Sequence, residues 1–291
     1  MLGDDVLIPC ATLFDKRHKK EMNGMESAEV RVGTLGWGYS DWSGVFYPSE
    51  AASREYIRLY AQTFNTVEVD STFYGTPRPT LVEHWRKVTP DNFLFCPKVP
   101  RQITHDLRLV NAARPFDDFV EVICGLGPRL GPMLLQMPPD FTQEEIGSLR
   151  NFLPSLRQAG RESLQVALEV RHRSLLTPEV TDLLKEYNVA LAATDYISVP
   201  RQFTITADIA YVRLIGRHNS YPEYRAPQVD RTNDLELWRE SIEAGLPRVS
   251  AMHIFCSNDY EGFGPATANK LKTVLGLPTS GPPPDPQGSL F

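Results

Sequence analysis

An alternation of short apolar runs with segments of helical hydrophobic spacing begins at Val30 and repeats about eight times along the chain. Parallel strands need a helical crossover between them, so this repeat predicts a parallel sheet covered by helices. The predicted strands cover residues 30–34, 66–70, 93–99, 132–137, 165–170, 189–195, 209–216 and 251–257. The predicted helices cover residues 53–63, 79–87, 116–126, 142–156, 178–187, 233–244 and 266–275. This order of elements limits the chain to a few parallel α/β folds.

The number of repeats favours a closed barrel over an open sheet. Units of roughly 30 residues, repeated about eight times, match a TIM-like (β/α)8 barrel in a single domain, which commonly takes about 250 residues. A doubly wound open sheet is the alternative, but no Gly-x-Gly-x-x-Gly turn follows the first predicted strand. We therefore expect a barrel and no nucleotide cofactor. The weak helical signal of residues 196–207 predicts an irregular connection there.

Three segments are expected along the chain. Residues 1–29 read as a loosely ordered N-terminal extension, residues 30–276 as the barrel, and residues 277–291 as a disordered tail rich in proline, glycine and serine. The first segment is too polar and basic for a secretory signal, and no apolar run approaches the roughly 18 residues of a membrane helix. The four cysteines lie far apart without Cys-x-x-Cys spacing, which favours neither a zinc site nor a disulfide framework. We therefore expect a cytoplasmic protein with no membrane contact.

The composition is that of an ordinary globular protein, with 42% hydrophobic and 23% charged residues. The formal net charge of -6 argues against a protein that grips nucleic acid over a broad surface, although a local basic cleft stays possible. A small polar anionic ligand is the favoured partner and nucleic acid the less favoured one. Nothing in the composition predicts an oligomeric state.

Residues 66–70 form an unusual predicted strand. Val67 and Val69 alternate with Glu68 and Asp70, so the two carboxylates share one face and the valines share the other. If the valines pack outward against helices, the carboxylates point into a confined interior, where a charge needs a partner. An edge strand with a solvated acidic face is the alternative. The hydroxyls and aromatic rings of residues 71–74 favour a functional strand end.

Polar and aromatic side chains gather at the predicted carboxyl ends of nearly all strands, where a parallel barrel carries its active site. The candidate catalytic residues are Glu68, Asp70, Glu169 and Asp195. The candidate substrate-binding residues are Trp37, Tyr39, Phe73, Tyr74, Lys98, Gln136, Arg171, His172, Arg213, Asn258 and Asp259. Together they predict a prepared pocket. Single members have structural alternatives, since Glu169 could pair with Arg171 inside the barrel, and Arg213 could neutralise Asp195.

The residue types in this set suggest its chemistry. The arginines and Lys98 present donors to an anionic group such as phosphate or carboxylate. The carboxylates could act as general acid and base or as oxygen ligands of a hard cation, so a divalent metal is possible. The aromatic side chains could stack on a sugar or a base. A lone loop histidine such as His172 is more often a supporting residue than a catalyst.

Several spaced blocks carry a family resemblance. They read GTLGWGY at 33–39, VEVDSTFY at 67–74, LQMPP at 135–139, LEVRH at 168–172 and YVRL at 211–214. With these blocks, and with Lys98, Asp195 and Asn258-Asp259 in order, the chain resembles the domain of unknown function 72 family, also called YecE-like, from about residue 30 to 275. The resemblance implies a TIM-like barrel and implies no established activity.

Three positions depart from that resemblance. Asp70 stands where an asparagine is common, and Ile215 stands where a histidine usually precedes the glycine of the seventh strand. The usual Phe-Asn-Asn-Asp block reads Phe-Cys-Ser-Asn-Asp over residues 255–259. If the missing histidine is essential, this member has an altered specificity or no activity. His218 lies close enough in sequence to compensate.

Three functions fit these residues. The first is an enzyme that uses carboxylates as acid and base on a small polar substrate that is phosphorylated or carboxylated. The second is a metal-assisted phosphodiesterase on nucleic acid, by analogy with endonuclease IV and sugar isomerase barrels, with Glu169, Asp195 and Asp259 as ligands. The third is a non-catalytic barrel that binds a metabolite. The first is favoured over the second because the histidines are few and scattered and the net charge is negative.

Overall fold

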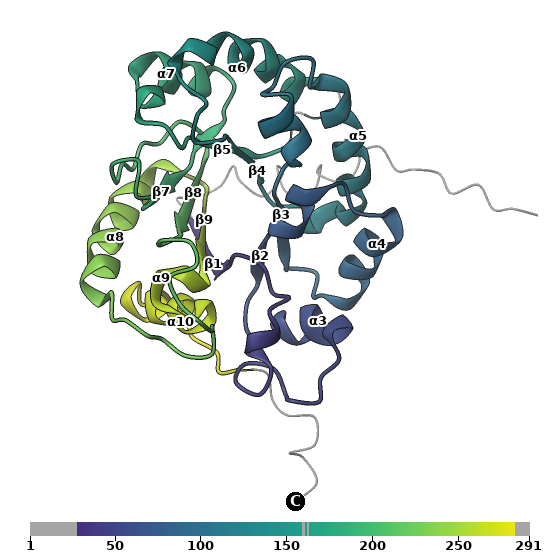
Figure 1. Ribbon diagram of the computed structural model, residues 1–291, viewed down its shortest axis with the longest axis vertical. Helices are drawn as coiled ribbons and strands as arrows, with labels where there is room; N and C mark the ends of the chain where they lie inside the picture. The colour runs from purple at the N-terminus through teal and green to yellow at the C-terminus, as the bar shows by residue number, and fades with distance from the viewer. Residues whose placement is uncertain (1–27, 159–160, 162, 283–291) are drawn as a thin grey trace, which may run out of the picture.

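The computed structural model describes residues 28–158, 161 and 163–282, so most of the two expected terminal segments lies outside the described residues. Short strands surround a central space, and helices lie outside them (Figure 1). The strands are β1 (Glu29–Thr34), β2 (Thr66–Val69), β3 (Leu94–Pro97), β4 (Met133–Gln136), β5 (Val166–Glu169), β6 (Ala190–Leu191), β7 (Ala193–Thr194), β8 (Ile209–Leu214) and β9 (Ala251–Cys256). The α-helices are α3 (Tyr56–Tyr60), α4 (Pro79–Val88), α5 (Ala113–Ile123), α6 (Ile146–Phe152), α7 (Pro178–Glu186), α8 (Thr232–Gly245), α9 (Asn258–Glu261) and α10 (Gly264–Val274).

The strands form three parallel sheets within the described part of the chain, ordered β1-β9-β8-β7, β2-β3 and β4-β5-β6. Isolated bridges connect Leu35 to Glu68 and Lys98 to Leu134, so the second sheet touches both of the others. The prediction of a parallel α/β fold is confirmed. Hydrogen bonds between the described strands do not close the sheets into one complete barrel.

Three predicted elements are broken in the structure. The predicted helix 53–63 begins as the 3-10 segment Ser53–Glu55 and continues as α3, which ends at Tyr60. The predicted strand 189–195 forms as β6 and β7, because its first part pairs with β5 and its last part with β8. The predicted helix 142–156 consists of α6 between two 3-10 segments, Gln143–Glu145 and Leu153–Arg157. Pro154 lies in the second of these segments and lacks the N–H that an α-helix interior requires.

The side-chain alternation of β2 separates an outer core from an inner, ionic face. Val67 and Val69 are fully buried in the large core between strands and helices. Glu68 is also fully buried, but it pairs with Arg213 of β8. The alternative of a solvated acidic edge strand is therefore wrong for Glu68. Asp70 starts the 3-10 segment that follows β2, and its side chain is 34% exposed.

The cysteines differ from the expectation. Cys96 and Cys256 are free and buried, Cys124 is disulfide-bonded, and Cys10 lies outside the described residues. The expectation that the cysteines form no disulfide is therefore wrong at Cys124.

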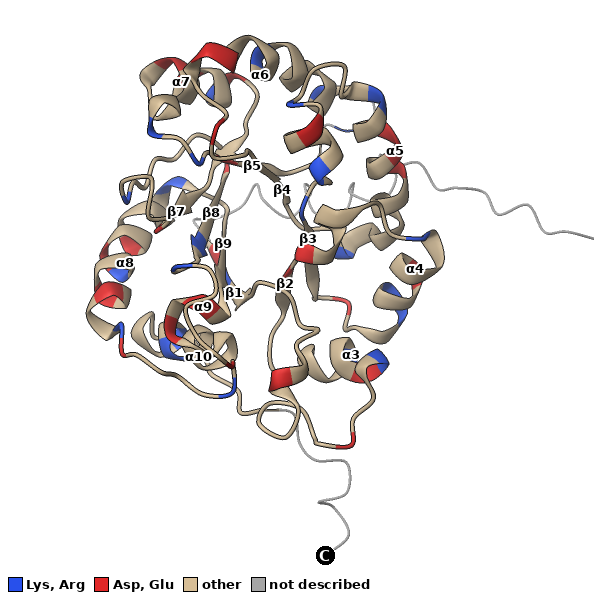
Figure 2. Cartoon of the chain, in the orientation of Figure 1, with Lys and Arg blue, Asp and Glu red and all other residues tan. Residues whose placement is uncertain are grey.

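The outer surface carries mixed charges. Basic and acidic residues are interspersed on α8, where Arg239 pairs with Glu236 and Glu243 (Figure 2). Among the described residues, none of the helices combines the length and the hydropathy that a membrane span requires.

Candidate active site

A cavity of about 750 Å³ opens where the strands end. Its walls come from the segments that follow β1, β2, β3, β4, β5, β8 and β9. The predicted site residues that line it are Trp37, Tyr39, Asp70, Phe73, Tyr74, Lys98, Gln136, Arg171, Arg213, Asn258 and Asp259. The structure thus brings most of the predicted residues to one cavity.

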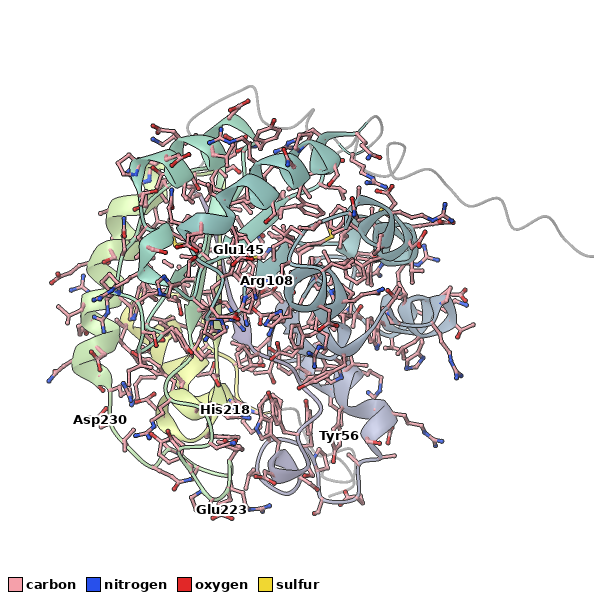
Figure 3. The ribbon with its side chains drawn as sticks, turned by 45° about the horizontal axis from the view of Figure 1, so that its top comes forward. Tyr56, Arg108, Glu145, His218, Glu223 and Asp230 are labelled. Atoms are coloured by element: carbon pink, nitrogen blue, oxygen red, sulfur yellow. The ribbon has the colours of Figure 1, made fainter. Side chains whose placement is uncertain are left out.

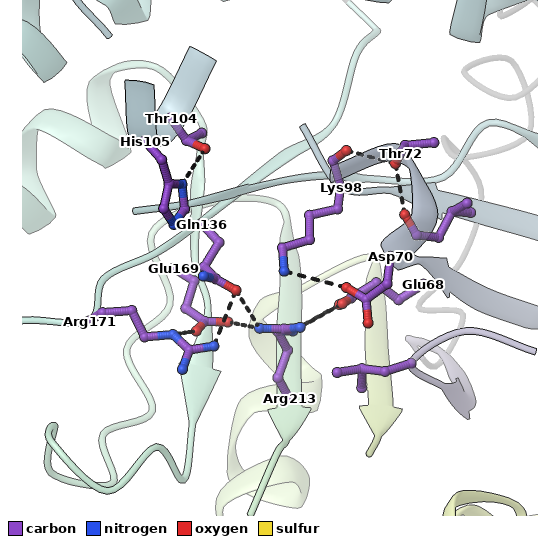
Figure 4. Close-up of polar contacts among 12 residues, drawn as sticks. Glu68, Asp70, Thr72, Lys98, Thr104, His105, Gln136, Glu169, Arg171 and Arg213 are labelled. Atoms are coloured by element: carbon purple, nitrogen blue, oxygen red, sulfur yellow. Dashed lines mark hydrogen bonds and ion pairs between the residues drawn. The ribbon is translucent and has the colours of Figure 1, made fainter. Parts of the chain in front are cut away.

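Arg213 is the centre of a buried ionic network in the wall of this cavity (Figure 4). Its Nε donates to Glu68 Oε2 at 2.9 Å and its Nη2 donates to Glu68 Oε1 at 2.6 Å, which makes a bidentate ion pair. Its Nη1 donates to Glu169 Oε2 and, at 3.4 Å, to Gln136 Oε1. The hydroxyl of Tyr211 donates to Glu68 Oε2 at 2.8 Å. One guanidinium thus pairs with two fully buried carboxylates.

Glu169 also forms an ion pair with a second cation, Arg171. Its Oε1 pairs with Arg171 Nε, and Arg171 Nη2 donates to Gln136 Oε1 at 3.2 Å. The guanidinium of Arg171 lies 3.9 Å from the ring centroid of Tyr196. The predicted pairing of Glu169 with Arg171 is confirmed, whereas the alternative that Arg213 neutralises Asp195 is wrong.

The two buried glutamates have pKa values shifted in opposite directions. Burial raises the pKa of Glu68, and nearby Asp70 adds to the rise, so that Arg213 compensates only in part. Burial also acts to raise the pKa of Glu169, but Arg213 and Arg171 together outweigh it and hold that pKa below its ordinary value. A carboxylate of lowered pKa is a weak proton acceptor. Glu169 therefore suits holding the arginines better than general base catalysis.

Lys98, which follows β3, lies beside Asp70 at the edge of this network (Figure 4). Its Nζ is 3.4 Å from Asp70 Oδ1 and 4.4 Å from the ring centroid of Phe73. Thr72 ties the two segments together, since its hydroxyl lies 2.7 Å from the carbonyl oxygens of both Val69 and Lys98. The side chain of Lys98 is 10% exposed, against 34% for Asp70. Glu68 and Glu169 are fully buried, so Asp70 is the carboxylate of this network that solvent reaches.

A π-helical segment, Gln102–Asp106, supports this corner and was not predicted from the sequence. The ring of His105 packs edge-on against Phe73, with centroids 5.0 Å apart, and its Nδ1 is 2.9 Å from the hydroxyl of the preceding threonine. Burial, Lys98 and Arg101 lower the pKa of His105 below its ordinary value.

Replacing Lys98 by methionine is expected to raise the pKa of His105 toward its ordinary value, because a positive charge beside the imidazole is removed. An NMR titration of the histidine ring protons measures this pKa. Lys87→Met changes an exposed lysine of α4 and should leave the pKa of His105 unmoved. A His105 pKa that is the same in the Lys98 variant and in the wild type would contradict the placement of Lys98.

Arg108, just after the π-helical segment, connects it to the residues that precede α6 (Figure 3). Its Nε donates to Glu145 Oε1 at 2.6 Å and its Nη1 donates to Asp140 Oδ1 at 3.0 Å. Arg108 has a φ of 50°, in the left-handed region that residues with a Cβ rarely adopt. The two ion pairs help hold this conformation.

Aromatic residues form one wall of the cavity. Trp37 packs edge-on against Trp85, with centroids 5.5 Å apart. The hydroxyl of Tyr39 donates to the carbonyl of Leu35 at 2.7 Å, which folds the segment after β1 back on itself. Tyr74 is 81% exposed and stands at the rim. The wall is thus rigid at Trp37 and Tyr39 and open at Tyr74.

Asn258 and Asp259 begin α9 directly after β9 and line the cavity from another side. The Oδ1 of Asn258 accepts from two N–H groups, one of them Trp42 Nε1 at 3.2 Å. The Oδ1 of Asp259 accepts from the hydroxyl of Tyr224 at 2.6 Å, and its Oδ2 lies 3.4 Å from His218 Nδ1. These contacts hold both side chains at the cavity.

The segment between β8 and α8 brings His218, which the sequence suggested as a substitute for the missing histidine, to the cavity together with residues that sequence reasoning did not assign to the site. His218, Asn219 and Tyr224 of this segment line the cavity, and Figure 3 shows His218 nearer the centre of the molecule than Glu223. The backbone N–H of Tyr224 donates to Asp41 Oδ2 at 2.9 Å, which fastens the segment to the loop after β1. The segment has no hydrophobic period, so no sequence signal could have placed Asn219 and Tyr224 at the cavity.

Tyr211 was also missed, although a signal for it exists. It lies two residues before Arg213 on β8, and side chains two residues apart on a strand share a face. A strand that directs Arg213 into the site therefore directs Tyr211 to the same side.

Four predicted site residues are not in the cavity wall. Glu68 and Glu169 lie buried in the network of Arg213, and Asp195 and His172 have other roles. Asp195 accepts from the backbone N–H of Ile215 at 2.8 Å and of Gly216 at 3.5 Å, so it caps the turn after β8. Burial raises the pKa of Asp195. The Nδ1 of His172 contacts the hydroxyl and the backbone N–H of Ser174 and caps a short 3-10 segment. Neither residue lines the cavity.

The predicted metal ligands are not gathered. Within the described residues, no three His, Cys, Asp or Glu side chains are placed to hold a metal ion together. Glu169 faces two arginines, Asp195 caps a turn and Asp259 accepts from Tyr224. The proposed ligand set for a metal-assisted phosphodiesterase is therefore wrong. Ile215 lines the cavity at the position where the family resemblance leads one to expect histidine.

The fold and the cavity define a parallel α/β protein with a pocket of charged and aromatic residues at the carboxyl ends of its strands. The family model described as "Protein of unknown function DUF72" matches residues 31–289, and the chain belongs to this family. UPF0759 protein YecE of Escherichia coli K12 is 32% identical over 143 residues, which are 49% of this chain and 48% of that relative. The chain thus matches about half the length of its curated relatives.

Solved structures of the same family share the fold. A DUF72 family protein from Thermotoga maritima MSB8 superimposes with a TM-score of 0.70 at 26% identity, over 85% of this chain and 99% of that one. A DUF72 family protein from Enterococcus faecalis V583 gives a TM-score of 0.71 at 20% identity, over 88% of this chain and 98% of that one. None of these relatives is named for an activity.

Proposed function

We propose that this protein is an enzyme that acts on a small polar anionic substrate in the cavity, on a TIM-like (β/α)8 barrel whose hydrogen bonding is incomplete. The short β6 and β7 follow one another and together take the place of one barrel strand, which leaves eight positions around the ring. Lys98 and Arg171 hold the anionic group, and Asp70 transfers a proton.

The observation that carries this proposal is the uneven pairing of the cations. Arg213 is matched by two buried carboxylates on all three of its nitrogens. Within the described residues, Lys98 Nζ has one hydrogen-bonding partner, Asp70 at 3.4 Å, and Arg171 Nη1 has none. Donors that remain unused on two cations at one cavity fit the oxygens of a phosphate or carboxylate.

The carboxylates predicted to be catalytic take different roles in this proposal. Glu68 and Glu169 hold Arg213 and Arg171, and Asp195 positions the turn after β8. Asp70 takes the acid and base role because, unlike Glu68 and Glu169, it is partly exposed and lines the cavity.

Turnover separates this enzyme from a protein that only binds a metabolite. A screen of phosphorylated and carboxylated metabolites, read by mass spectrometry, should identify a substrate that the wild type consumes. Tight binding of such compounds without any conversion would favour the non-catalytic function instead.

Replacing Asp70 by asparagine is expected to lower kcat about 100-fold and to change KM little, because the general acid and base is lost while anion binding remains. Asp106→Asn is the matched control, since Asp106 is exposed and pairs with Arg101 outside the cavity. Asparagine is also the residue that the family resemblance leads one to expect at position 70, so this variant shows whether the role of Asp70 is particular to this chain. An unchanged kcat would remove Asp70 from the mechanism.

A further inference from the structure

We infer that the part of the cavity formed by Asn258 and Asp259 recognises hydroxyl groups, so that the ligand is a polyhydroxylated anion, a sugar acid or a sugar phosphate. This inference rests on the proposed function, because it places the anionic group at Lys98 and Arg171. It adds the chemistry of the remainder of the ligand.

Asn258 contributes a hydrogen-bond donor without an acceptor. Its Oδ1 accepts from Trp42 Nε1 at 3.2 Å and from the backbone N–H of Gly264 at 2.8 Å, which fixes the orientation of the amide. Its Nδ2 is buried and has no partner among the described residues, although Asn258 itself lines the cavity. A buried N–H group without an acceptor is unfavourable, so an acceptor oxygen is missing here.

Asp259 contributes an acceptor that lacks a permanent cation. The residue is 8% exposed, and its Oδ1 is occupied by the hydroxyl of Tyr224 at 2.6 Å. Its Oδ2 lies 3.4 Å from His218 Nδ1, whose side chain is 86% exposed. In the described part of the chain, no lysine or arginine forms an ion pair with Asp259. The Oδ2 can therefore accept a hydrogen bond from a ligand.

A hydroxyl group matches this pair of residues. It has one hydrogen to donate to Asp259 and lone pairs to accept from Asn258. An ammonium group would serve Asp259 but offers no acceptor to Asn258, and a second carboxylate would be repelled by Asp259. The aromatic rings of Trp37 and Tyr39 line the same cavity and can pack on the apolar face of a sugar.

Calorimetric titration of matched ligand pairs tests this inference. Gluconate is compared with hexanoate, and glucitol 6-phosphate with hexyl phosphate, since each pair shares its anion and its six-carbon chain and differs in its hydroxyls. The wild type should bind the polyol of at least one pair about tenfold more tightly than its alkyl partner. Which pair shows the difference tells a sugar acid from a sugar phosphate.

Asp259→Asn should abolish the advantage of the polyol without weakening the binding of the alkyl anion, because the amide keeps an oxygen for Tyr224 and loses the second acceptor. Asp182→Asn, at an exposed aspartate of α7, is the control for the loss of one charge and should retain the advantage.

Three results would overturn the hydroxyl subsite while leaving the proposed function intact. The first is that the alkyl anions bind to the wild type as tightly as the polyols. The second is that Asp259→Asn still binds the polyol more tightly than its alkyl partner. A preference for 6-aminohexanoate over hexanoate that is lost in Asp259→Asn would show a cation subsite and would also overturn it. If none of these anions binds to the wild type, the proposed function itself fails.

Discussion

Replacing Arg213 by methionine is expected to lower the free energy of unfolding by about 3–5 kcal/mol, because it leaves the fully buried Glu68 and Glu169 without their shared cation. The guanidinium donates to both carboxylates, and the nearest remaining groups are Tyr211 for Glu68 and Arg171 for Glu169. A hydroxyl cannot balance a buried charge. Urea denaturation followed by circular dichroism measures the loss.

The loss of unfolding free energy in Arg213→Met should be smaller at acid pH. Without Arg213, the folded-state pKa of each carboxylate is higher than in the wild type, because burial is then opposed by fewer positive charges. The raised pKa of Glu68 lies further above the unfolded value of about 4.3, so the stability deficit of the variant grows as pH rises through this pKa. In the wild type, the lowered pKa of Glu169 makes a contribution that is present above the unfolded pKa and is lost as pH falls through the folded pKa. Both effects make the difference in the free energy of unfolding between Arg213→Met and the wild type smaller below about pH 4.

Arg239→Met is the control for this measurement. Arg239 pairs with Glu236 and Glu243 on the exposed surface of α8, where solvent screens an ion pair and its contribution to stability is small. A loss for Arg213→Met no larger than that of Arg239→Met, or a loss that widens at acid pH, would show that the buried network does not depend on this guanidinium.

Replacing Lys98 by methionine is expected to lower kcat/KM about 1000-fold once a substrate is in hand. The variant keeps the aliphatic stem beside Phe73 but loses the ammonium that faces Asp70 and the cavity. Loss of one partner of a largely desolvated charged contact costs about 2–5 kcal/mol, which corresponds to roughly 30-fold to several thousand-fold.

Two control variants test whether the loss of activity in Lys98→Met comes from the loss of anion binding. Lys98→Arg retains the positive charge and should keep more activity than Lys98→Met, and Lys87→Met on the surface of α4 should keep all of it. Binding of hexyl phosphate to the variants, measured by calorimetry, should follow the same order. Equal affinity of the wild type and Lys98→Met for hexyl phosphate would exclude Lys98 as an anion-binding residue.

The strands and the residues at their ends could be predicted because the signals for them are local. The apolar runs placed β1, β2, β3, β4, β5, β8 and β9 to within a few residues, and parallel pairing then brought their carboxyl ends to one cavity. The interior position of Glu68 followed from the alternation of β2, since Val67 and Val69 required the outer face.

The partners of these residues could not be predicted from local signals. Arg213 meets Glu68 from 145 residues away and Glu169 from 44 residues away, and this choice over Asp195 depends on the arrangement of the strands in space. The role of Asp195 could not be predicted for the same reason, because its carboxylate caps the turn after the neighbouring strand β8. His218 and Tyr224 lie on an irregular segment whose course is set by contacts with Asp259 and Asp41.

The crystal structure of the protein with hexyl phosphate bound tests the central claim most directly. We expect phosphate oxygens within about 3 Å of Lys98 Nζ and of Arg171 Nη1, with the alkyl chain leading into the cavity. Hexyl phosphate bound away from these two side chains, or a cavity without it at a saturating concentration, would contradict the claim that this pocket holds an anionic substrate.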